Sequence, residues 1–405
     1  MSWLGRARRE LWQRRRPQGL IGWAYLWPWV ASPVREHRQI WWQSGVGWPR
    51  SLWLLVQGWQ WLRWQLWFGP RAILLCLHHR RAQGAQQQGI APWLQAWRLC
   101  RLSLGWAIPP GDVYRFGLHR QPGRALDYVY DVESGYHRWR SAALGLSQAS
   151  LDLLQDKIAL AQALEGRGIA VVATAQVVQK TPTPPPLASL LPGSHPYFCK
   201  NRSTNQGRGA FRVWHTPGGL GGLRFEGGHL TEGAAVEAAW RDLCQRDDAL
   251  IQPDLANHPA LEGLTLPDRA ITVRYISQGQ GHDLKALTAT LEVASYEDET
   301  TGRVGYSLFP LQVCTGQVLP WPNASDLPPA ARQAHDRLRQ HLSHPFHLPH
   351  WSTLVAASHS AHQMFPDVWA IAWDWVITPS GPVLLEGNSG WGTATPQMIQ
   401  GGFLE

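Results

Sequence analysis

The stretch WAIAWDWVITPSGPVLLEGN, residues 369–388, carries the strongest structural signal in the chain. Two runs of strand-favouring residues flank the Pro-Ser-Gly sequence at 379–381. Proline presets the backbone for the first position of a turn, and glycine tolerates the left-handed position that closes a three-residue loop. Such a loop would pair Thr378 with Pro382. The sequence therefore predicts a β-hairpin whose register is set by the length of its loop.

The same register brings polar side chains together. Asp374 would lie directly opposite Glu386, and side-chain alternation places Asn388 on the same face. Two carboxylates that face each other across a strand pair repel. A divalent cation removes that repulsion, because hard cations prefer oxygen ligands at such a separation. We therefore predict a metal site at these three residues; the alternative is an exposed hairpin that tolerates two acids.

Charge and tryptophan are unevenly distributed along the chain. Residues 1–110 contain fifteen arginines, no lysine and two acids, a net charge of +13, together with 16 of the 25 tryptophans. The remaining residues contain 22 basic and 27 acidic side chains, a net charge of −5. A basic, Trp-rich front of this kind suits an anionic surface: a membrane, an acidic glycan or nucleic acid.

Length and cysteine usage bound the class of protein. A chain of 405 residues can bury a large core and hold two or three lobes. Its five cysteines are scattered and form no CxxC pair. That usage indicates a reducing compartment and argues against a disulfide framework or a structural zinc site. Residues 20–31 are apolar but aromatic-rich and lack a small-residue cleavage site, so we expect no secretion.

The front of the chain is expected to be helical. Ser51 can cap a helix that runs to Trp67 and stops at Gly69-Pro70. The helix is apolar nearly all round, with Gln57, Gln60 and Arg63 as a thin polar stripe. It is too short and interrupted to predict a transmembrane span. Either it lies in a membrane interface, which Trp and Arg favour, or it is a core helix packed on the body.

Further elements follow from hydrophobic periodicity and turn residues. Helices are expected at 92–102, 151–164 (capped by Ser150), 326–343 and 351–362. Strands are expected at 125–132, 169–178, 211–215, 270–277 and 288–295, and an extended linker at 181–196.

Residues 197–215 (YFCKNRSTNQGRGAFRVWH) suggest a nucleotide site. A strand with Lys200 leads into a loop with Gly207 and Gly209, and a second strand follows. A loop of this kind can fold over a triphosphate, with backbone N–H groups aimed at the phosphate oxygens. The chain has only four lysines but 33 arginines. A lysine at position 200 therefore indicates that a compact point charge, rather than a forked guanidinium, is needed there. The alternative is an ordinary hairpin whose glycines only make the turn.

In the order of these features the chain resembles the ATP-grasp superfamily, and most closely its sugar-transfer-associated branch. The pieces are LLQDKIALAQALEGRGIAV (153–171), PYFCKNRSTNQGRG (196–209), ALIQPDLANHP (249–259), AITVRYIS (270–277) and IAWDWVITPSGPVLLEGNSGWG (371–392). The last piece is the most specific. The resemblance covers about residues 111–405, which implies an α+β ATP-grasp catalytic region behind a helical, Trp/Arg-rich extension at 1–110.

The resemblance implies roles for individual residues. Lys157 and Lys200 resemble the two lysines that hold the ATP phosphates, and Gly207, Arg208 and Gly209 resemble the phosphate lid. The remaining implied residues are the adenine hinge, Ile251 and Gln252; the strand arginine that steadies the transferring group, Arg274; and the Mg²⁺ ligands, Asp374, Glu386 and Asn388.

The chain also departs from the family pattern. Asn201 stands where a proline usually follows the second lysine. Residues 279–319 lack the expected Asn…Gly-Gly signature, which leaves the acceptor side undefined.

The implied activity is that of an ATP- and Mg²⁺-dependent carboxylate–amine ligase that forms an acyl phosphate, in cell-envelope or polysaccharide modification. The expected partners are a small-molecule carboxylate, an amine and an anionic membrane surface, with no nucleic acid. The expected location is cytoplasmic, peripheral at the inner face of the membrane. The alternatives are an ATP-dependent phosphotransferase, or a non-catalytic binding protein at a membrane surface or glycan.

Overall fold

The computed structural model describes residues 11–12, 14–26, 31–88, 90–203, 207–281, 283–298, 302–321, 329–342 and 345–404. Contacts divide the chain into two compact units. The helical unit comprises residues up to Leu146 together with those from Gly392 onwards, and the two-sheet unit comprises Ser147–Trp391. The division proposed after residue 110 falls inside the helical unit and stays a prediction of where the catalytic region begins.

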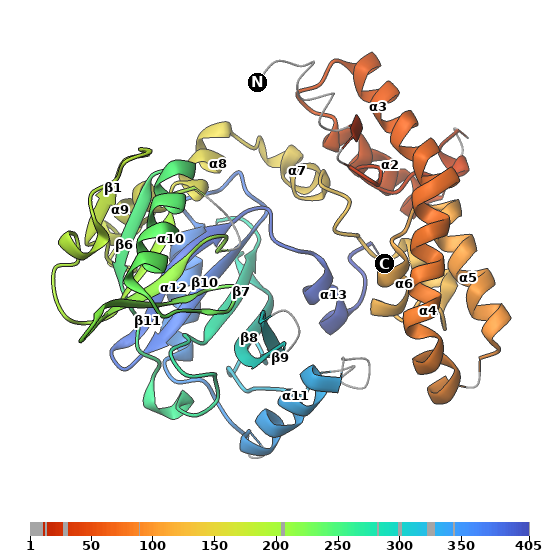
Figure 1. The fold of residues 1–405 in the computed structure, drawn as a ribbon. Helices are drawn as coiled ribbons and strands as arrows, with labels where there is room; N and C mark the ends of the chain where they lie inside the picture. Colours follow the sequence, from red (N-terminus) through yellow and green to blue (C-terminus); the bar gives the residue numbers. More distant parts are fainter. Residues whose placement is uncertain are drawn as a thin grey trace. The chain divides into compact units, whose positions relative to one another are not determined.

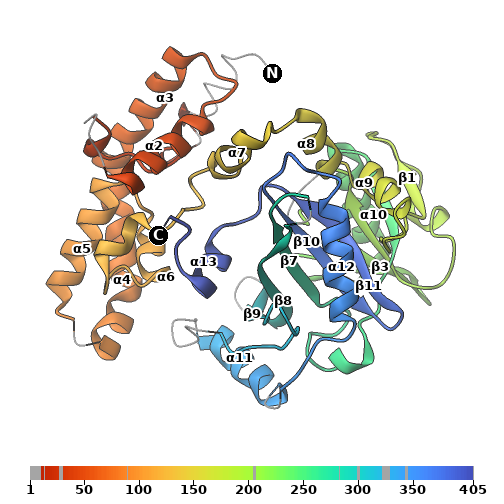
Figure 2. The same ribbon diagram turned by 180° about the vertical axis from the view of Figure 1, so that it is seen from behind.

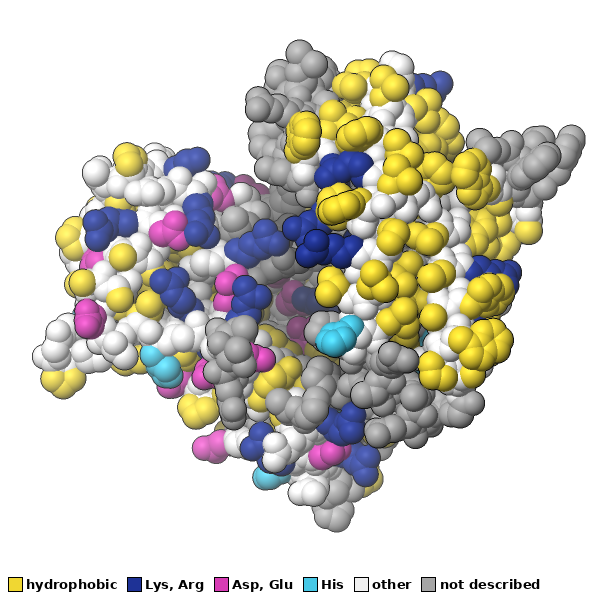
Figure 3. Space-filling model, turned by 45° about the vertical axis from the view of Figure 1, so that its right-hand side comes forward, with side chains coloured by type: hydrophobic (Ala, Val, Ile, Leu, Met, Phe, Trp, Pro, Cys, Tyr) yellow, Lys and Arg dark blue, Asp and Glu magenta, His cyan; other side chains and the backbone are white. Residues whose placement is uncertain are grey.

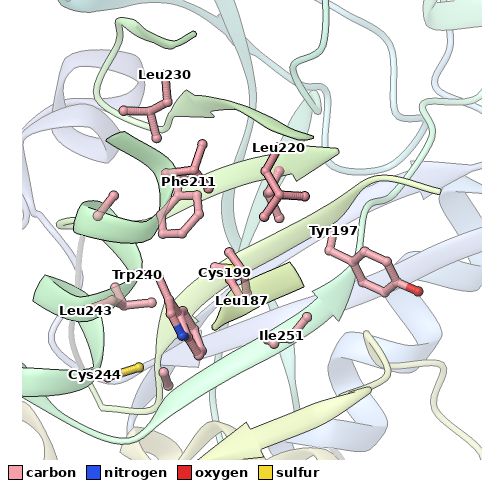
Figure 4. Close-up of a cluster of buried hydrophobic side chains, with 14 residues drawn as sticks. Leu187, Tyr197, Cys199, Phe211, Leu220, Leu230, Trp240, Leu243, Cys244 and Ile251 are labelled. Atoms are coloured by element: carbon pink, nitrogen blue, oxygen red, sulfur yellow. The ribbon is translucent and has the colours of Figure 1, made fainter. Parts of the chain in front are cut away.

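The first sheet of the two-sheet unit has six antiparallel strands in the order β1-β6-β2-β3-β4-β5. Figure 1 labels two of them, β1 and β6. The strands are β1 (Gln176–Val178), β2 (Tyr197–Asn201), β3 (Phe211–Thr216), β4 (Gly219–Arg224), β5 (His229–Leu230) and β6 (Ala249–Pro253). α10 (Gly233–Arg246) packs on this sheet. Figure 4 shows the core between them, where Trp240 and Leu243 of α10 meet Cys199, Phe211 and Ile251 of the strands.

The second sheet has five antiparallel strands in the order β11-β10-β7-β8-β9. The strands are β7 (Thr272–Gln278), β8 (Lys285–Glu297), β9 (Val304–Pro310), β10 (Ala370–Thr378) and β11 (Gly381–Asn388). α12 (Trp351–His362) lies against β7 and β10, as Figure 2 shows from behind, and α11 (Pro329–His341) packs on β8 and β9. The strands predicted at 211–215, 270–277 and 288–295 and the helix at 351–362 are therefore confirmed.

β10 is buried along its whole length because both of its faces are covered. Trp373 and Trp375 share the face toward α12: the Trp375 indole donates to Ser358 Oγ of α12 (3.0 Å), and the Trp373 indole donates to Ser277 Oγ of β7 (2.9 Å). The partner of Trp373 on β11 is Gly387, where an added Cβ would lie 2.5 Å from the indole ring. Asp374 therefore points to the opposite face of the sheet.

The β10–β11 hairpin reaches the predicted pairing by a different route. Its turn has two residues, since Thr378 pairs with Gly381 and not with Pro382. That turn alone would shift the register by one residue and place Asp374 opposite Leu385. A β-bulge at Leu385 absorbs the shift, so Asp374 does face Glu386. The predicted three-residue loop is wrong, and the predicted carboxylate pairing is confirmed.

The region before the first sheet differs from the prediction. The single helix expected at 151–164 is two helices, α8 (Gln148–Gln155) and α9 (Lys157–Glu165). Ser147, rather than Ser150, caps α8. Asp156 interrupts the run because its backbone is extended while its carboxylate accepts the N–H groups of the first turn of α9. Of the strand expected at 169–178, only β1 forms. The linker at 181–196 contains one short 3₁₀ turn, η5 (Leu187–Ser189).

The helical unit contains short and long helices around its own core. They are η1 (Trp23–Leu26), α2 (Ser32–Ser44), α3 (Arg50–Arg63), η2 (Trp64–Phe68), α4 (Gly69–Gln88), α5 (Pro92–Gly105), α6 (Pro110–Arg115), η3 (Pro122–Leu126), α7 (Tyr136–Ser141), η4 (Ala142–Leu144) and α13 (Ala394–Gln400). α5 confirms the helix expected from Pro92. No described helix is both long and apolar enough to cross a bilayer.

The helix expected between Ser51 and Trp67 does not stop at Gly69-Pro70. It begins at Arg50, one residue after Pro49, so Ser51 is not its cap. It continues through the π-helical turn η2 into α4. Gly69 donates to the carbonyl of Trp64, and an added Cβ would lie 2.6 Å from that oxygen. Pro70 has no backbone N–H and so cannot make the usual hydrogen bond inside a helix. The wider π-helical turn directly before it lets the helix continue past this proline.

Residues 125–132 do not form the predicted strand. Their backbone N–H groups bond to side chains instead: Val129 donates to Gln397 Oε1 (2.8 Å) and Tyr130 to Glu133 Oε2 (3.0 Å). Tyr128 and Tyr130 pack in the core of the helical unit. The Gln397 amide also donates to the Val129 carbonyl (2.6 Å), so the last segment of the chain completes this unit.

A buried ion pair fastens α2 to this segment. His37 Nδ1 lies 2.7 Å from Glu133 Oε1, and His37 Nε2 lies 3.0 Å from the carbonyl oxygen of Leu126. Both partners are acceptors, so both ring nitrogens donate and the ring is the charged imidazolium. Burial lowers the pKa of His37, but the carboxylate of Glu133 and, less strongly, that of Glu36 raise it by more, so the net pKa lies above its usual value.

We predict that the free energy of unfolding of the helical unit falls as pH rises through the folded-state pKa of His37. The raised pKa means that the stabilisation is complete below the unfolded-state pKa of about 6.5 and is lost above the folded value. Denaturant unfolding from about pH 6 to about pH 9 measures it. His37→Gln should lower stability at acidic pH and flatten this dependence. An unchanged pH profile in that variant would refute the assignment.

Candidate functional site

A cavity of about 390 Å³ opens between the two sheets of the two-sheet unit. Strands β2, β3, β4 and β6 contribute one wall, and β7 to β11 contribute the other. Part of the lining is apolar and comes from both sheets: Phe198, Leu223, Phe225, Val376 and Leu385. Leu385 is the bulged residue of β11, and the bulge lets Leu385 and its neighbour Glu386 both line the cavity.

Asp374, Glu386 and Asn388 meet beside this cavity. The Asn388 amide nitrogen lies 3.4 Å from Asp374 Oδ2 and 3.2 Å from Glu386 Oε1. The amide therefore donates to both carboxylates. The three side chains that the sequence placed on one face of the hairpin do come together.

Arg274 of β7 neutralises one of these carboxylates. Its Nε and Nη2 donate to the two oxygens of Asp374 at 2.8 and 3.0 Å, a bidentate pair. Its Nη1 lies 3.4 Å from Glu292 Oε1 on β8. The Asp374 carboxylate raises the pKa of Arg274, which keeps the guanidinium charged.

The two carboxylates differ in their electrostatic surroundings. Burial raises the pKa of Asp374, and Arg274 offsets only part of that effect. Burial acts in the same direction on Glu386, but the positive charges of Lys157 and Lys200 outweigh it and hold the pKa of Glu386 below its usual value. Glu386 is therefore the more firmly ionised of the pair.

Lys157 is positioned by the break between α8 and α9. As the first residue of α9 it follows the cap Asp156, which is clamped by Arg202 Nε (2.9 Å) and Nη2 (2.5 Å). The hydrogen bond from Arg202 lowers the pKa of Asp156 and so keeps the clamp charged. Lys157 Nζ donates to the Arg202 carbonyl (3.2 Å) and lies 3.6 Å from Glu386 Oε2. The clamp holds this amine toward the cavity.

Lys200 lies on β2 and lines the cavity from the first sheet. Burial lowers the pKa of its amine to about 8, with the attraction of Glu386 acting against this and the repulsion of Lys157 adding to it. The next residue, Asn201, is buried, and its amide donates to the Leu243 carbonyl of α10 (2.8 Å). The asparagine in place of the usual proline thus ties the end of β2 to α10.

The glycine loop reaches the cavity with part of its length. Gly207 and Arg208 line it, whereas Gly209 does not. Both glycines have positive φ, +59° and +75°. A Cβ on Gly207 would also lie 2.5 Å from the ring of Phe225. Glycine is therefore required at Gly207 by backbone conformation and by the close approach of an aromatic wall.

The two expected hinge residues lie in different surroundings. Gln252 lines the cavity, and its amide donates to Thr174 Oγ1 (3.2 Å). Ile251 does not line it: its side chain is in the core of the first sheet, and its carbonyl accepts the N–H of Ala175 (2.9 Å). The residues after Gln252 that face the cavity are Pro253, Asp254 and Leu255.

Several charged residues at the cavity were not anticipated. Glu292 is one; its alternation with Thr290 in the predicted strand at 288–295 was the available signal. Arg212 is another, held by Asp254 and by Asp268, each at 2.7 Å. Arg269 also lines the cavity, and burial lowers the pKa of its guanidinium. Nothing in the local sequence distinguishes these arginines from the other 31.

The residues at the carboxylate pair fit a hard divalent cation. Asp374, Glu386 and Asn388 offer carboxylate and amide oxygens, which Mg²⁺ prefers over nitrogen or sulfur. A half-turn of the Asn388 amide would replace its nitrogen with its oxygen near both carboxylates. The described residues contain no cluster of three or more His, Cys, Asp or Glu side chains suited to a metal, so the set depends on the amide and on ligands from outside the protein.

Comparisons with known proteins place the two-sheet unit in a family. The model of the family described as sugar-transfer associated ATP-grasp matches residues 146–405. No curated protein matches the chain.

Similar solved structures include the VanG D-Ala:D-Ser ligase from Enterococcus faecalis, with 13% identity, a TM-score of 0.36, and coverage of 62% of this chain and 58% of that one. The D-alanine–D-alanine ligase from Bacillus anthracis has 10% identity, a TM-score of 0.38, and coverage of 69% and 74%. The N5-carboxyaminoimidazole synthetase from Staphylococcus aureus has 11% identity, a TM-score of 0.33, and coverage of 61% and 47%. Over the first three matched structures the chain spans 58%, 53% and 45% of their lengths.

The family match covers well over half of the chain and coincides with the two-sheet unit and the residues after it. The expected α+β fold with a helical region ahead of it is confirmed. The chain belongs to the sugar-transfer associated ATP-grasp family.

Proposed function

We propose that the two-sheet unit catalyses ATP-dependent ligation of a carboxylate to an amine through an acyl phosphate. The observation that carries this proposal is the convergence of charge at one cavity: two carboxylates and an amide from the β10–β11 hairpin, faced by Arg274, Lys157 and Lys200 from three other elements. Fixed charges of both signs at one point suit a reaction that moves a phosphoryl group.

The lining of the cavity supports one orientation for ATP. The apolar side chains, with Gln252, suit the adenine. Lys157, Lys200 and the N–H groups near Gly207 suit the phosphates, because ammonium groups and oriented backbone amides both favour anions. Asp374, Glu386 and Asn388 would hold Mg²⁺, which when bound neutralises charge on the β- and γ-phosphates.

The chain's own residues then act by position and charge. A substrate carboxylate oxygen attacks the γ-phosphorus, the bond to the β-bridging oxygen breaks, and ADP leaves. Arg274, fixed by Asp374, lies where it can stabilise the transferring group. The amine then attacks the acyl carbon and expels phosphate, which gives an amide and releases one proton. The substrate carboxylate is the nucleophile, so the reaction needs no side-chain nucleophile.

The description of the family supports a proposal for the metabolic origin of the substrates. Association with sugar transfer suggests acids and amines from cell-envelope or polysaccharide precursors. We place the reaction in the cytoplasm, with the protein peripheral at the inner face of the membrane.

Hydroxylamine tests the reaction class by standing in for the natural amine. With ATP, Mg²⁺ and a library of carboxylates, an acyl phosphate should be trapped as a hydroxamate, detected by mass together with ADP. ADP release and amide formation should require acid and amine together. A phosphorylated product without hydroxamate would show a phosphotransferase instead. Binding of ATP without any turnover across the library would favour a non-catalytic binding protein.

We predict that Glu386→Gln lowers Mg²⁺-dependent ATP turnover by at least roughly 100-fold, because it removes the more firmly ionised carboxylate of the site. Asp374→Asn and Asn388→Ala should have similar effects, although loss of Asp374 also strands Arg274. Glu165→Gln, at an exposed carboxylate of α9, is the matched control. Circular dichroism should show an unchanged fold. Turnover of Glu386→Gln equal to that of the control would reject the site.

We predict that Lys200→Met weakens ATP binding by roughly 100-fold and that Lys200→Arg weakens it less. A planar, forked guanidinium replaces the charge but not the compact shape that the half-buried position accommodates. Isothermal titration calorimetry with ATP measures both variants. Lys180→Met, at an exposed position, is the control. Equal damage from the control would mean that lysine loss acts through stability.

A further inference from the structure

The buried face of α3 is partly polar. Trp53, Val56, Gln57 and Gln60 face the interior of the helical unit, and Trp64 of η2 continues this buried face. Gln57 donates to Gln60 Oε1 (3.0 Å), and its own Oε1 accepts from the backbone N–H of Gln18 (3.0 Å) and from the indole of Trp41 (3.4 Å). Gln57 and Gln60, two of the three residues of the polar stripe that the sequence showed on this helix, are therefore turned inward and hydrogen-bonded, whereas Arg63 is only partly buried.

The exposed face of the same helix is apolar. We call it the outer face; it comprises Leu54, Leu55, Trp59 and Leu62 of α3, Leu66 and Trp67 of η2, Leu74 and Leu75 of α4, and Trp93 and Trp97 of α5. Leu55 and Leu66 are 71% and 72% exposed. Figure 3 shows apolar side chains gathered over one side of these helices. A helix with glutamine inside and leucine outside is inverted relative to a helix bathed in water.

The stretch of sequence that carries the outer face has charged residues of one sign. No acid occurs between Glu36 and Asp112. Eight arginines lie in that interval: Arg38, Arg50, Arg63, Arg71, Arg80, Arg81, Arg98 and Arg101. Arg71 and Arg101 are exposed, and the guanidinium of Arg101 lies over the ring of Trp97, 5.4 Å from its centroid. An apolar surface bordered by arginine and tryptophan matches the interface of an anionic bilayer.

We propose that the outer face docks on an anionic lipid bilayer, with its leucines and tryptophans at the acyl boundary and its arginines at the headgroups. Lipid fits better than a second copy of the chain, because two copies would oppose arginines with no acidic side chain between Glu36 and Asp112 to pair with them. The outer face is then the surface by which the protein associates peripherally with the membrane, as proposed under its function. This association does not depend on the ligation chemistry.

Co-sedimentation of the full chain with vesicles tests the proposal without ATP. Vesicles of phosphatidylcholine alone are compared with vesicles that also contain phosphatidylglycerol. Binding should require the anionic lipid and weaken as added salt shortens the Debye length to about 8 Å. The triple variant Leu55→Gln, Leu66→Gln, Trp67→Gln should bind at least roughly 100-fold more weakly. Val177→Gln, at an exposed apolar position of β1, is the matched control and should bind as the original chain does.

Arginine variants separate charge from apolar contact. Arg71→Gln with Arg101→Gln should lower binding to anionic vesicles by roughly 30-fold, about fivefold for each arginine. Thermal unfolding of all variants should match that of the original chain, since every changed side chain is exposed. ATP binding by the triple variant should also be unchanged, which keeps this test separate from that of the ligase.

Several outcomes would overturn the proposal. The first is a full chain that ignores anionic vesicles at low salt, and the second is a triple variant that binds as tightly as the control. Binding to native membranes but not to pure lipid would identify a membrane protein as the partner. Self-association that the triple variant abolishes, with no lipid binding, would identify a second copy of the chain.

Discussion

Asp374 faces Glu386 across the β10–β11 hairpin, and this opposition of two carboxylates is the constraint on which the site depends. Repulsion between them must be offset before the hairpin can be stable. The compensating charges come from elsewhere: Arg274 from the neighbouring strand, Lys157 from helix α9, and Lys200 from the opposite wall. Lys200 lies on the first sheet and Glu386 on the second, so the attraction between their charges acts across the cavity and favours the approach of the two sheets.

The hairpin shows how much of the two-sheet unit can be predicted from the sequence. The sequence predicts the pairing of Asp374 with Glu386 correctly, although the predicted turn is one residue longer than the turn in the structure. The two errors cancel, because the bulge at Leu385 adds one unpaired residue to β11 and so restores the predicted register. Leucine has no special preference for a bulged position, so no local signal in the sequence marks the bulge. The break at Asp156 was more accessible: an acid before the first helical residue is a capping signal, but the apolar periodicity runs through it.

The helical unit was less predictable, because the hydrophobicity of a side chain does not indicate whether that side chain is buried in a protein core or exposed on the surface. The run that contains Leu55 and Gln57 was expected either in a membrane interface or in a core, and the structure places the glutamine inside and the leucine outside. The strand expected around Tyr128 and Tyr130 failed for a related reason. Aromatic alternation predicts burial, but here the backbone bonds to side chains from distant parts of the sequence. Arg212 enters the site through tertiary packing, with no signal in its local sequence, whereas Glu292 follows from its alternation with Thr290 on β8.

The hydrogen bonds between Gln397 and Val129 have a consequence for biosynthesis. The two residues are 268 positions apart, and the whole two-sheet unit is translated between them. The helical unit therefore lacks one of its packing partners while the nascent chain elongates, whereas the sheets can close as soon as β11 has emerged. During that interval the apolar side of α3 is already made. During translation, the apolar side of α3 is therefore exposed to its surroundings before α13 has packed into the helical unit.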